Sequence, residues 1–133
     1  MQLKLATDHA ICTLLYLSKT NSTCTAQEIS SEMHISLNYL RSTILNLRDA
    51  GLVSTHNGRI GGCRLLKSPK EITLYDVISI MEGTIKINRC LEDDGYWSRD
   101  AADYCPVHQY YQSIQDLLEN KLKSVTIADI LHQ

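Results

Sequence analysis

The sequence predicts a mainly α-helical protein with one small β-hairpin wing, arranged as a winged helix-turn-helix followed by a long C-terminal helix. Three features predict this fold: a short helix, a turn and a longer helix in succession, a glycine-rich hairpin directly after them, and a later amphipathic stretch of helical period. This order of elements is the layout of a winged helix-turn-helix. With 133 residues, 44% of them hydrophobic, the chain is long enough to bury the core of one domain.

The first two helices are predicted from apolar spacing and from a capping pattern. Apolar residues recur at helical spacing over residues 3–17, so the first helix is expected to end near Lys19. Thr25 and Glu28 have the spacing of a capping box, in which each side chain bonds the backbone N–H of the other residue. They predict a short second helix that ends around Met33.

A third helix and a hairpin follow. Ser36 is expected to cap the third helix, and Gly51 to close it in the left-handed conformation that helix ends favour. The apolar positions of this helix are Leu37, Leu40, Ile44, Leu45 and Leu47. Residues 52–55 and 63–66 alternate like strands, and the segment 56–62 between them holds three of the six glycines, which predicts a hairpin with a tight tip.

The second half is predicted to contain three helices and a long loop. Thr73 is expected to cap a fourth helix that runs to about Glu82, whereas residues 83–104 show no clear period. Pro106 is expected to start a long helix, and Thr126 to cap a short final one. The long helix carries an apolar stripe at Val107, Tyr110, Tyr111, Ile114, Leu117, Leu118 and Leu122.

The formal net charge of −2 is unevenly distributed along the chain. Residues 1–70 hold eight Lys or Arg and four Asp or Glu, which gives +4, and residues 71–133 hold five and eleven, which gives −6. Such a distribution can arise by chance. Because a phosphate-binding surface needs positive charge, however, the first half is the expected location of any nucleic-acid interface.

The predicted DNA-reading residues lie at the start of the third helix and around the hairpin tip. Asn and Arg bond adenine and guanine edges in the major groove, while Ser and Tyr commonly meet phosphates. Backbone N–H groups and arginines of the hairpin suit phosphates or a minor groove. An ordinary amphipathic helix or an ordinary turn would show either pattern alone, and their order and spacing favour DNA binding. The candidates are Ser36, Asn38, Tyr39, Arg41, Ser42, Asn57, Gly58, Arg59, Gly61, Gly62 and Arg64.

Compartment and cysteine use are predicted together. No apolar run is long enough for a membrane span and the N-terminus lacks the pattern of a signal peptide, so a cytoplasmic location is expected. Five cysteines are an odd number, which favours thiols, metal ligands or redox chemistry over structural disulfides. Cys12 is expected in the core and Cys24 in an exposed turn, while Cys63 receives no role.

Residues 57–65, with the sequence Asn-Gly-Arg-Ile-Gly-Gly-Cys-Arg-Leu, resemble the glycine-rich wing of the IscR/NsrR/RsrR family of bacterial transcriptional regulators. Further segments that are similar to this family are residues 6–10, 36–40, 52–53, 72–78 and 126–131. The resemblance implies a homodimer that is joined along the long C-terminal helix and binds a palindromic double-stranded DNA operator. It divides the chain into a DNA-binding domain at residues 1–82, a sensor or cluster loop at 83–105 and a dimerisation region at 106–133.

Many members of this family hold an iron–sulfur cluster through three cysteines of the loop, and this chain departs from that pattern because its loop has only Cys90 and Cys105. The resemblance to RsrR-like members implies a 2Fe–2S cluster completed by Asp8 and His34 of the partner subunit. His108 matches the histidine of the three-cysteine pattern and competes as a ligand. In the alternative interpretation, Cys90 and Cys105 form a reversible disulfide or remain unbound thiols. Asp8 then only stabilises the first turn of its helix through the helix dipole, and His34 is a solvated turn residue.

Two functions are therefore expected, both without enzymatic activity. The first is a dimeric DNA-binding regulator, a repressor or an activator, whose operator affinity is controlled by the cluster and which senses redox state, nitric oxide or iron supply. The alternative is a cluster-free regulator of the same fold that responds to thiol oxidation or to a protein or metabolite partner. An enzyme is disfavoured because Cys105 and His108 lack an oriented third group of the kind nucleophilic catalysis needs.

Overall fold

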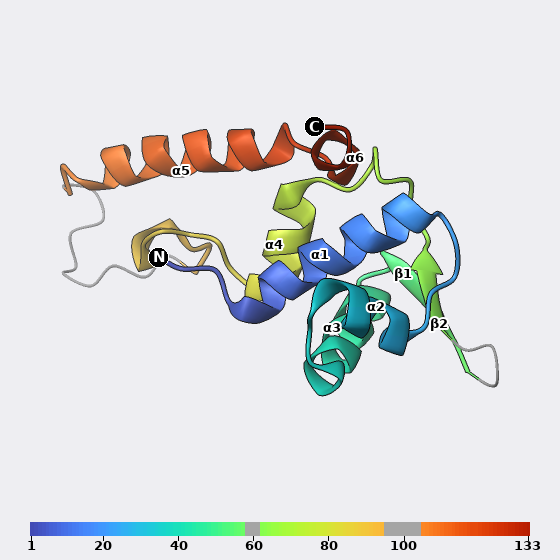
Figure 1. Ribbon diagram of the computed structural model, residues 1–133. Coiled ribbons are helices and arrows are strands. Elements are labelled where there is room, and N and C mark those ends of the chain that lie inside the picture. Colours follow the sequence, from blue (N-terminus) through green and yellow to red (C-terminus); the bar gives the residue numbers. More distant parts are fainter. Residues whose placement is uncertain (58–61, 95–104) are drawn as a thin grey trace.

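The computed structural model describes residues 1–57, 62–94 and 105–133, which form helices and one hairpin (Figure 1). In chain order the elements are α1 (Leu5–Thr20), α2 (Ala26–Met33), α3 (Leu37–Asp49), β1 (Val53–His56), β2 (Gly62–Leu65), α4 (Leu74–Glu82), the 3₁₀ turn η1 (Arg89–Leu91), α5 (His108–Lys123) and α6 (Ile127–Leu131). The predicted order of helices and hairpin is confirmed, and the predicted helix starts and ends mostly agree within two residues.

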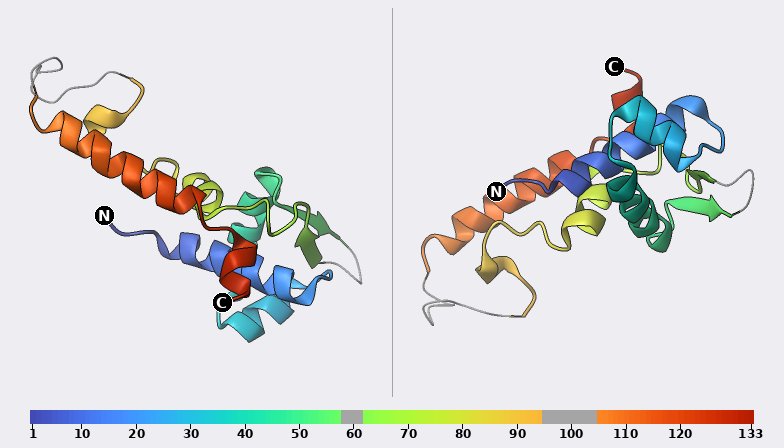
Figure 2. Two further views of the ribbon diagram at one scale, coloured as in Figure 1. Left: turned by 90° about the horizontal axis from the view of Figure 1, so that it is seen from above. Right: turned by 60° about the horizontal axis from the view of Figure 1, so that its bottom comes forward.

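The core is built around α1, which packs against α3, α4 and α6 (Figure 2). Its fully buried residues include Leu14 and Leu17, which meet Leu40 and Leu47 of α3 and Ile127 of α6 in one hydrophobic cluster. The apolar stripes read from the sequence are thus the faces that these helices bury. Within the described residues, none of the helices has the length and apolarity needed to cross a membrane.

The turn between α2 and α3 depends on an unusual backbone conformation. The capping box predicted at Thr25 and Glu28 is present, with bonds of 3.1 and 3.3 Å. At the other end of α2, His34 adopts the left-handed conformation with φ 56°, which few non-glycine residues take. Ser30 fastens the turn, because its carbonyl accepts from the Ile35 N–H and its hydroxyl donates to the Ile35 carbonyl.

The hairpin is anchored to the turn that precedes α2. Strands β1 and β2 are antiparallel with Val53 opposite Leu65. On its other edge, Cys63 of β2 exchanges two backbone hydrogen bonds of 2.9 and 2.8 Å with Cys24. The prediction of an exposed Cys24 is wrong, because this bridge draws the turn onto the sheet and leaves the Cys24 side chain 2% exposed.

The C-terminal helix α6 is joined to the start of α4 by paired caps. Thr73 and Thr126 each cap a helix through a capping box, as their positions predict. The two residues also form an antiparallel bridge, with the Leu74 N–H bonding the Val125 carbonyl at 2.9 Å. At the far end of α4, Glu82 accepts at 3.0 Å from the backbone N–H of Lys4, the N-cap residue of α1.

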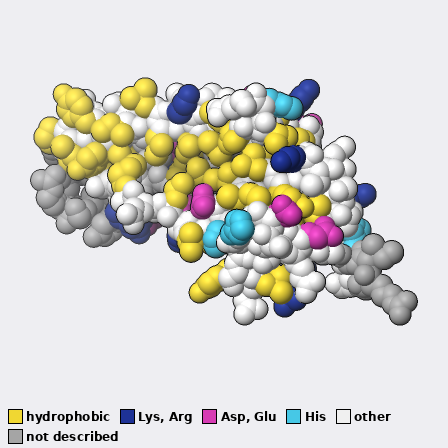
Figure 3. Space-filling view, viewed as in Figure 1, with side chains coloured by type: hydrophobic (Ala, Val, Ile, Leu, Met, Phe, Trp, Pro, Cys, Tyr) yellow, Lys and Arg dark blue, Asp and Glu magenta, His cyan; other side chains and the backbone are white. Residues whose placement is uncertain are grey.

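Helix α5 lies along one edge of the molecule and exposes much of its apolar stripe. It begins at His108, two residues later than expected from Pro106. Cys105 and Val107 open it with a turn in which the Cys105 carbonyl accepts from the His108 N–H. Figure 3 shows hydrophobic side chains gathered along the upper part of this face. Its exposed members are Val107, at the N-cap of α5, and Tyr110, Ile114 and Leu117 on the helix, the last of them 72% exposed.

Candidate nucleic-acid interface and cysteine site

The start of α3 presents a polar face to solvent. All five predicted reading residues of this helix, Ser36, Asn38, Tyr39, Arg41 and Ser42, are exposed, and Tyr39 is 66% exposed. The opposite face carries the buried residues Leu40, Thr43, Ile44 and Leu47. Ser36 occupies the N-cap position as predicted, but its side chain makes no capping hydrogen bond, so its hydroxyl stays available.

The hairpin adds two further exposed candidates, Asn57 and Arg64. Gly62 is half-buried within β2, opposite His56, rather than at the tip. A Cβ atom at Gly62 would lie 2.5 Å from the Cys24 carbonyl oxygen, so the anchoring of the hairpin accounts for this glycine. The other predicted tip residues, Gly58, Arg59 and Gly61, lie outside the described residues.

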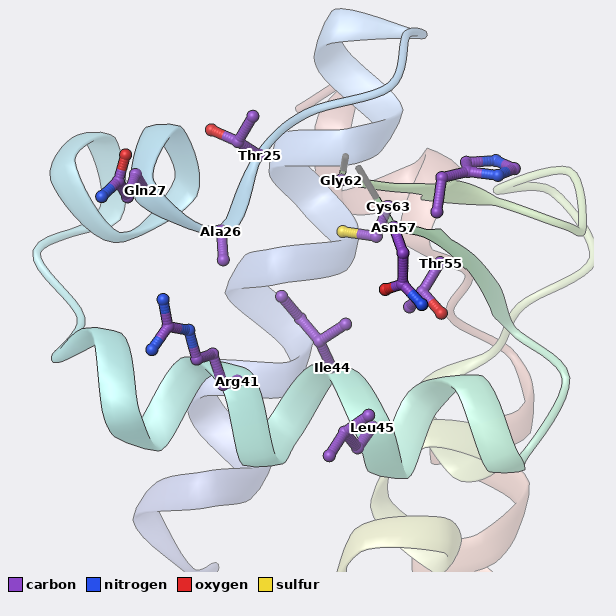
Figure 4. Close-up of a pocket in the computed structure, with 11 residues that line it drawn as sticks. Thr25, Ala26, Gln27, Arg41, Ile44, Leu45, Thr55, Asn57, Gly62 and Cys63 are labelled. Atoms are coloured by element: carbon purple, nitrogen blue, oxygen red, sulfur yellow. The ribbon is translucent and has the colours of Figure 1, made fainter. Parts of the chain in front are cut away.

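A groove of about 520 Å³ separates α3 from the start of α2 and the hairpin. Figure 4 shows Arg41 projecting from α3 toward α2, with Gln27 across from it and Asn57 on the hairpin side. Among the described residues, Arg41 and Arg64 make no ion pair, whereas Arg48 is paired with Asp49 at 3.1 Å. Two exposed guanidinium groups, one on α3 and one on β2, are thus unpaired with any acidic side chain of the described residues, and their donors are the kind that bind phosphates and guanine edges.

The second predicted site lies at the other end of the molecule, where η1 meets α5. Cys90 and His108 are brought together there, with 3.3 Å between the Cys90 Sγ and the His108 Nδ1. Cys105 lies in the same turn as His108, because its carbonyl accepts from the His108 N–H at 3.2 Å. Asn88 fixes η1 by accepting from the Cys90 N–H at 3.1 Å. One thiol and one imidazole therefore already touch within a single chain.

A buried glutamine that the sequence reasoning missed holds this loop on α5. Gln115 is 0% exposed, its Oε1 accepts from the Ile87 N–H at 2.9 Å, and its Nε2 donates to the Ile85 carbonyl at 3.1 Å. Beside it, a hydrogen bond to Glu119 raises the pKa of Lys86. A polar residue four positions after Tyr111 and three before Leu118, inside the apolar stripe, was the available signal.

Asp8 and His34 are both exposed, Asp8 in the first turn of α1 and His34 at the end of α2. In the part of the chain that the structure describes, no three His, Cys, Asp or Glu side chains converge closely enough to hold a metal ion. The described donors of one chain therefore do not by themselves form a 2Fe–2S site, and the predicted ligand set depends on a second copy.

The remaining cysteine expectations have mixed outcomes. Cys12 is half-buried and packs against the core rather than lying inside it. Burial raises the pKa of its thiol, and the neighbouring Asp8 carboxylate raises it further. Cys63 is 1% exposed, and burial together with Cys24 raises the pKa of its thiol to about 11.

Known proteins share the sequence pattern and the fold of this chain. Residues 3–133 match the family Rrf2, described as an iron-dependent transcriptional regulator. The chain belongs to the Rrf2 family. This Rrf2 protein is 30% identical to the transcriptional regulator IscR of Escherichia coli over 105 residues. The matched stretch covers 79% of this chain and 63% of that relative. The chain thus spans less than two thirds of the length of the curated relatives it matches.

Solved Rrf2-type structures have the same fold. CymR of B. subtilis, titled the global cysteine regulator, has a TM-score of 0.80 and 25% identity, over 99% of this chain and 97% of that one. IscR of T. potens has a TM-score of 0.75 and 22% identity, over 99% and 87%. The winged helix-turn-helix and the resemblance read from the sequence are confirmed, and these relatives are regulators rather than enzymes.

Proposed function

We propose that this Rrf2 protein is a dimeric transcriptional regulator that reads double-stranded DNA with α3 and the hairpin. The observation that carries the proposal is the exposed polar face of α3, where Arg41 lines the groove and makes no ion pair with the described residues. Arg64 on β2 is likewise exposed and makes no ion pair among them. Asn38 and Arg41 suit base edges in a major groove, and Arg64 suits a phosphate. The +4 charge of residues 1–70 supports this orientation on DNA.

The DNA test uses full-length protein, a random-sequence duplex of about 30 base pairs and duplexes selected from a random library. Arg64→Ala should weaken binding to all of them and reduce the salt slope by about one, because one phosphate contact is lost. Arg41→Ala should cost about 1–3 kcal/mol on selected duplexes and relax the preference at one base pair. Lys123→Ala, an exposed site on α5 away from the face of Ile114 and Leu117, is the matched control for lost charge. Unchanged salt slopes for both arginine variants would contradict the proposal.

Dimerisation is proposed through the exposed apolar face of α5. Ile114 and Leu117 lie one turn apart on it, and covering them with a second copy would remove apolar area from water. Ile114→Glu with Leu117→Glu should yield monomers in sedimentation velocity. The matched control, Gln109→Glu with Asn120→Glu, adds the same charge on another exposed face of α5 and should leave the dimer intact. Two monomeric variants, or two dimeric ones, would contradict this assignment.

For the signal, we propose that Cys90 and Cys105 hold a 2Fe–2S cluster with Asp8 and His34 of a second copy, which would supply reversible one-electron chemistry. The 3.3 Å contact between Cys90 and His108 supports the competing set in which His108 replaces one of these ligands. Visible spectra and iron content after anaerobic reconstitution test both sets. His34→Gly keeps the left-handed turn but removes the imidazole, so cluster loss in this variant and retention in His108→Ala would favour the first set.

Cluster loss in His108→Ala with retention in His34→Gly would favour His108 as the ligand. Cys12→Ser is the thiol-deletion control, and it should leave the iron content unchanged. A colourless, iron-free protein after reconstitution would refute both sets. The cluster-free alternative would then apply, in which oxidation of Cys90 and Cys105 or binding of a partner carries the signal. Non-reducing peptide mapping for a Cys90–Cys105 link would test it directly.

A further inference from the structure

Cys24 and Cys63 face each other in the anchoring bridge between the α1–α2 turn and β2, far along the chain from the loop cysteines. Their backbones exchange both hydrogen bonds, at 2.9 and 2.8 Å. Residues paired in this way have Cα atoms about 5.5 Å apart. Cysteines that form disulfides have Cα separations of about 4.4–6.8 Å. The backbone register thus places the two Cα atoms within the range of a disulfide, and closing the bond requires the Cβ atoms to approach slightly from the separation of about 4.5–5.5 Å in paired strands.

From this juxtaposition we infer that Cys24 and Cys63 form a reversible intramolecular disulfide, a covalent link between the entrance of α2 and the second strand of the hairpin. The structure holds both as free thiols, 2% and 1% exposed. The two side chains are also neighbours, since Cys24 is one of the groups that raise the pKa of Cys63, after burial. Among the described residues, each of the two buried cysteines pairs through its backbone with the other and with no further cysteine.

The chemistry needs a two-electron oxidant, for which hydrogen peroxide serves. Cys24 is assigned as the site of first attack, because the Thr20 Oγ1 lies 3.2 Å from its Sγ and because burial raises the pKa of Cys63, which leaves little thiolate there. The Cys24 thiolate takes one peroxide oxygen to become a sulfenic acid, and hydroxide leaves. The Cys63 sulfur then attacks the Cys24 sulfur, so that the S–S bond forms, the S–O bond breaks and the thiol proton ends in water. In total two thiols lose two electrons and two protons, and one peroxide becomes two waters.

The link would join two elements that border the groove beside Arg41, since Thr25 and Cys63 both line it. The hydroxyl of Thr20 can hydrogen-bond the sulfur of Cys24 during the reaction, because its Oγ1 lies 3.2 Å from the Cys24 Sγ. Gly62 allows β2 and the α1–α2 turn to lie close together, because a side chain at this position would collide with the Cys24 carbonyl. Burial makes the reaction slow, so it is expected over minutes to hours. The inference is independent of the proposed function, because its readout is a covalent bond.

The test uses the full chain with Cys12→Ser, Cys90→Ser and Cys105→Ser, which leaves Cys24 and Cys63 as its only cysteines. After treatment with hydrogen peroxide and alkylation without reductant, the intact mass should fall by about 2 Da with no alkyl adduct. Dithiothreitol should then restore two alkylatable thiols. Adding Cys63→Ala to this background is the control, in which the loss of 2 Da should vanish and a dimedone adduct should report the stranded sulfenic acid on Cys24.

Two fully alkylated thiols after oxidation, or a link found only between chains on a non-reducing gel, would overturn the inference. Circular dichroism first establishes that the serine variant is folded. If it is not, peptide mapping of the oxidised natural chain answers the same question, because a peptide pair joining Cys24 to Cys63 is expected. A map that pairs Cys24 or Cys63 only with other cysteines would refute it.

Discussion

Replacing Gly62 by Ala tests how the hairpin is held on the rest of the molecule. The new Cβ would lie 2.5 Å from the Cys24 carbonyl oxygen and 2.9 Å from its carbon, and both are backbone atoms that cannot rotate away. The strand must therefore move, and the two Cys24–Cys63 backbone bonds lengthen or break. A buried hydrogen bond left unmade costs about 1–3 kcal/mol. We expect the free energy of unfolding to fall by about 2–4 kcal/mol.

Urea denaturation at one protein concentration measures this loss, which should lower the midpoint by about 1–2 M. Gly51→Ala is the matched control, because Gly51 has φ +79° but nothing within 4 Å of an added Cβ. It should carry only the left-handed penalty of about 1–2 kcal/mol. If Gly62→Ala were no more destabilising than Gly51→Ala, the seating of β2 on the α1–α2 turn would be refuted.

Three further predictions concern other parts of the fold. Gln115→Leu should destabilise the protein by about 2–3 kcal/mol in urea denaturation, because the Ile87 N–H and the Ile85 carbonyl lose their buried partner; an effect below 0.5 kcal/mol would contradict the described clamp. His34→Gly should be at least 0.5 kcal/mol more stable than His34→Ala in the same assay, because only glycine takes φ 56° without strain, and equal stability would argue against this turn. The backbone and side-chain hydrogen bonds with Thr126 lower the pKa of Asp129 below its ordinary value. Its stabilisation is therefore present above the ordinary pKa of an aspartate and is lost as the pH falls through the lowered folded-state pKa. The difference in Tm between the natural chain and Asp129→Asn should shrink in that acidic range, and a constant difference would exclude this carboxylate as the cause.

Most of the fold was predictable because its signals are local. Thr25, Thr73 and Thr126 each have an acidic residue three positions later, and each begins a helix as that spacing predicts. The same local logic identified Gly51, which takes the left-handed conformation just after α3. Spacing along the chain was enough in these cases, because the interacting atoms lie within one helical turn.

Features that depend on distant pairings were not predictable in this way. Cys24 reads as a turn residue until β2, almost forty positions later, is known to bridge it. Gln115 reads as one polar residue on an amphipathic helix, and only the docked loop shows that its amide is buried. The contact between Cys90 and His108 likewise needs η1 and α5 to meet. The sequence proposed Cys90 as a cluster ligand and His108 as a competing one, and the fold shows that the two side chains lie in contact.

Helix α5 can also be considered as a lever. Its sixteen residues correspond to a rod about 24 Å long. One end carries His108 beside Cys90, and the other continues directly into Thr126 and α6, which packs on α1. By simple geometry, a tilt of about 5° would displace one end by about 2 Å relative to the other. Helix α5 thus links the turn that holds Cys90 and His108 to α6, and α6 in turn packs on α1, the helix that contacts α3.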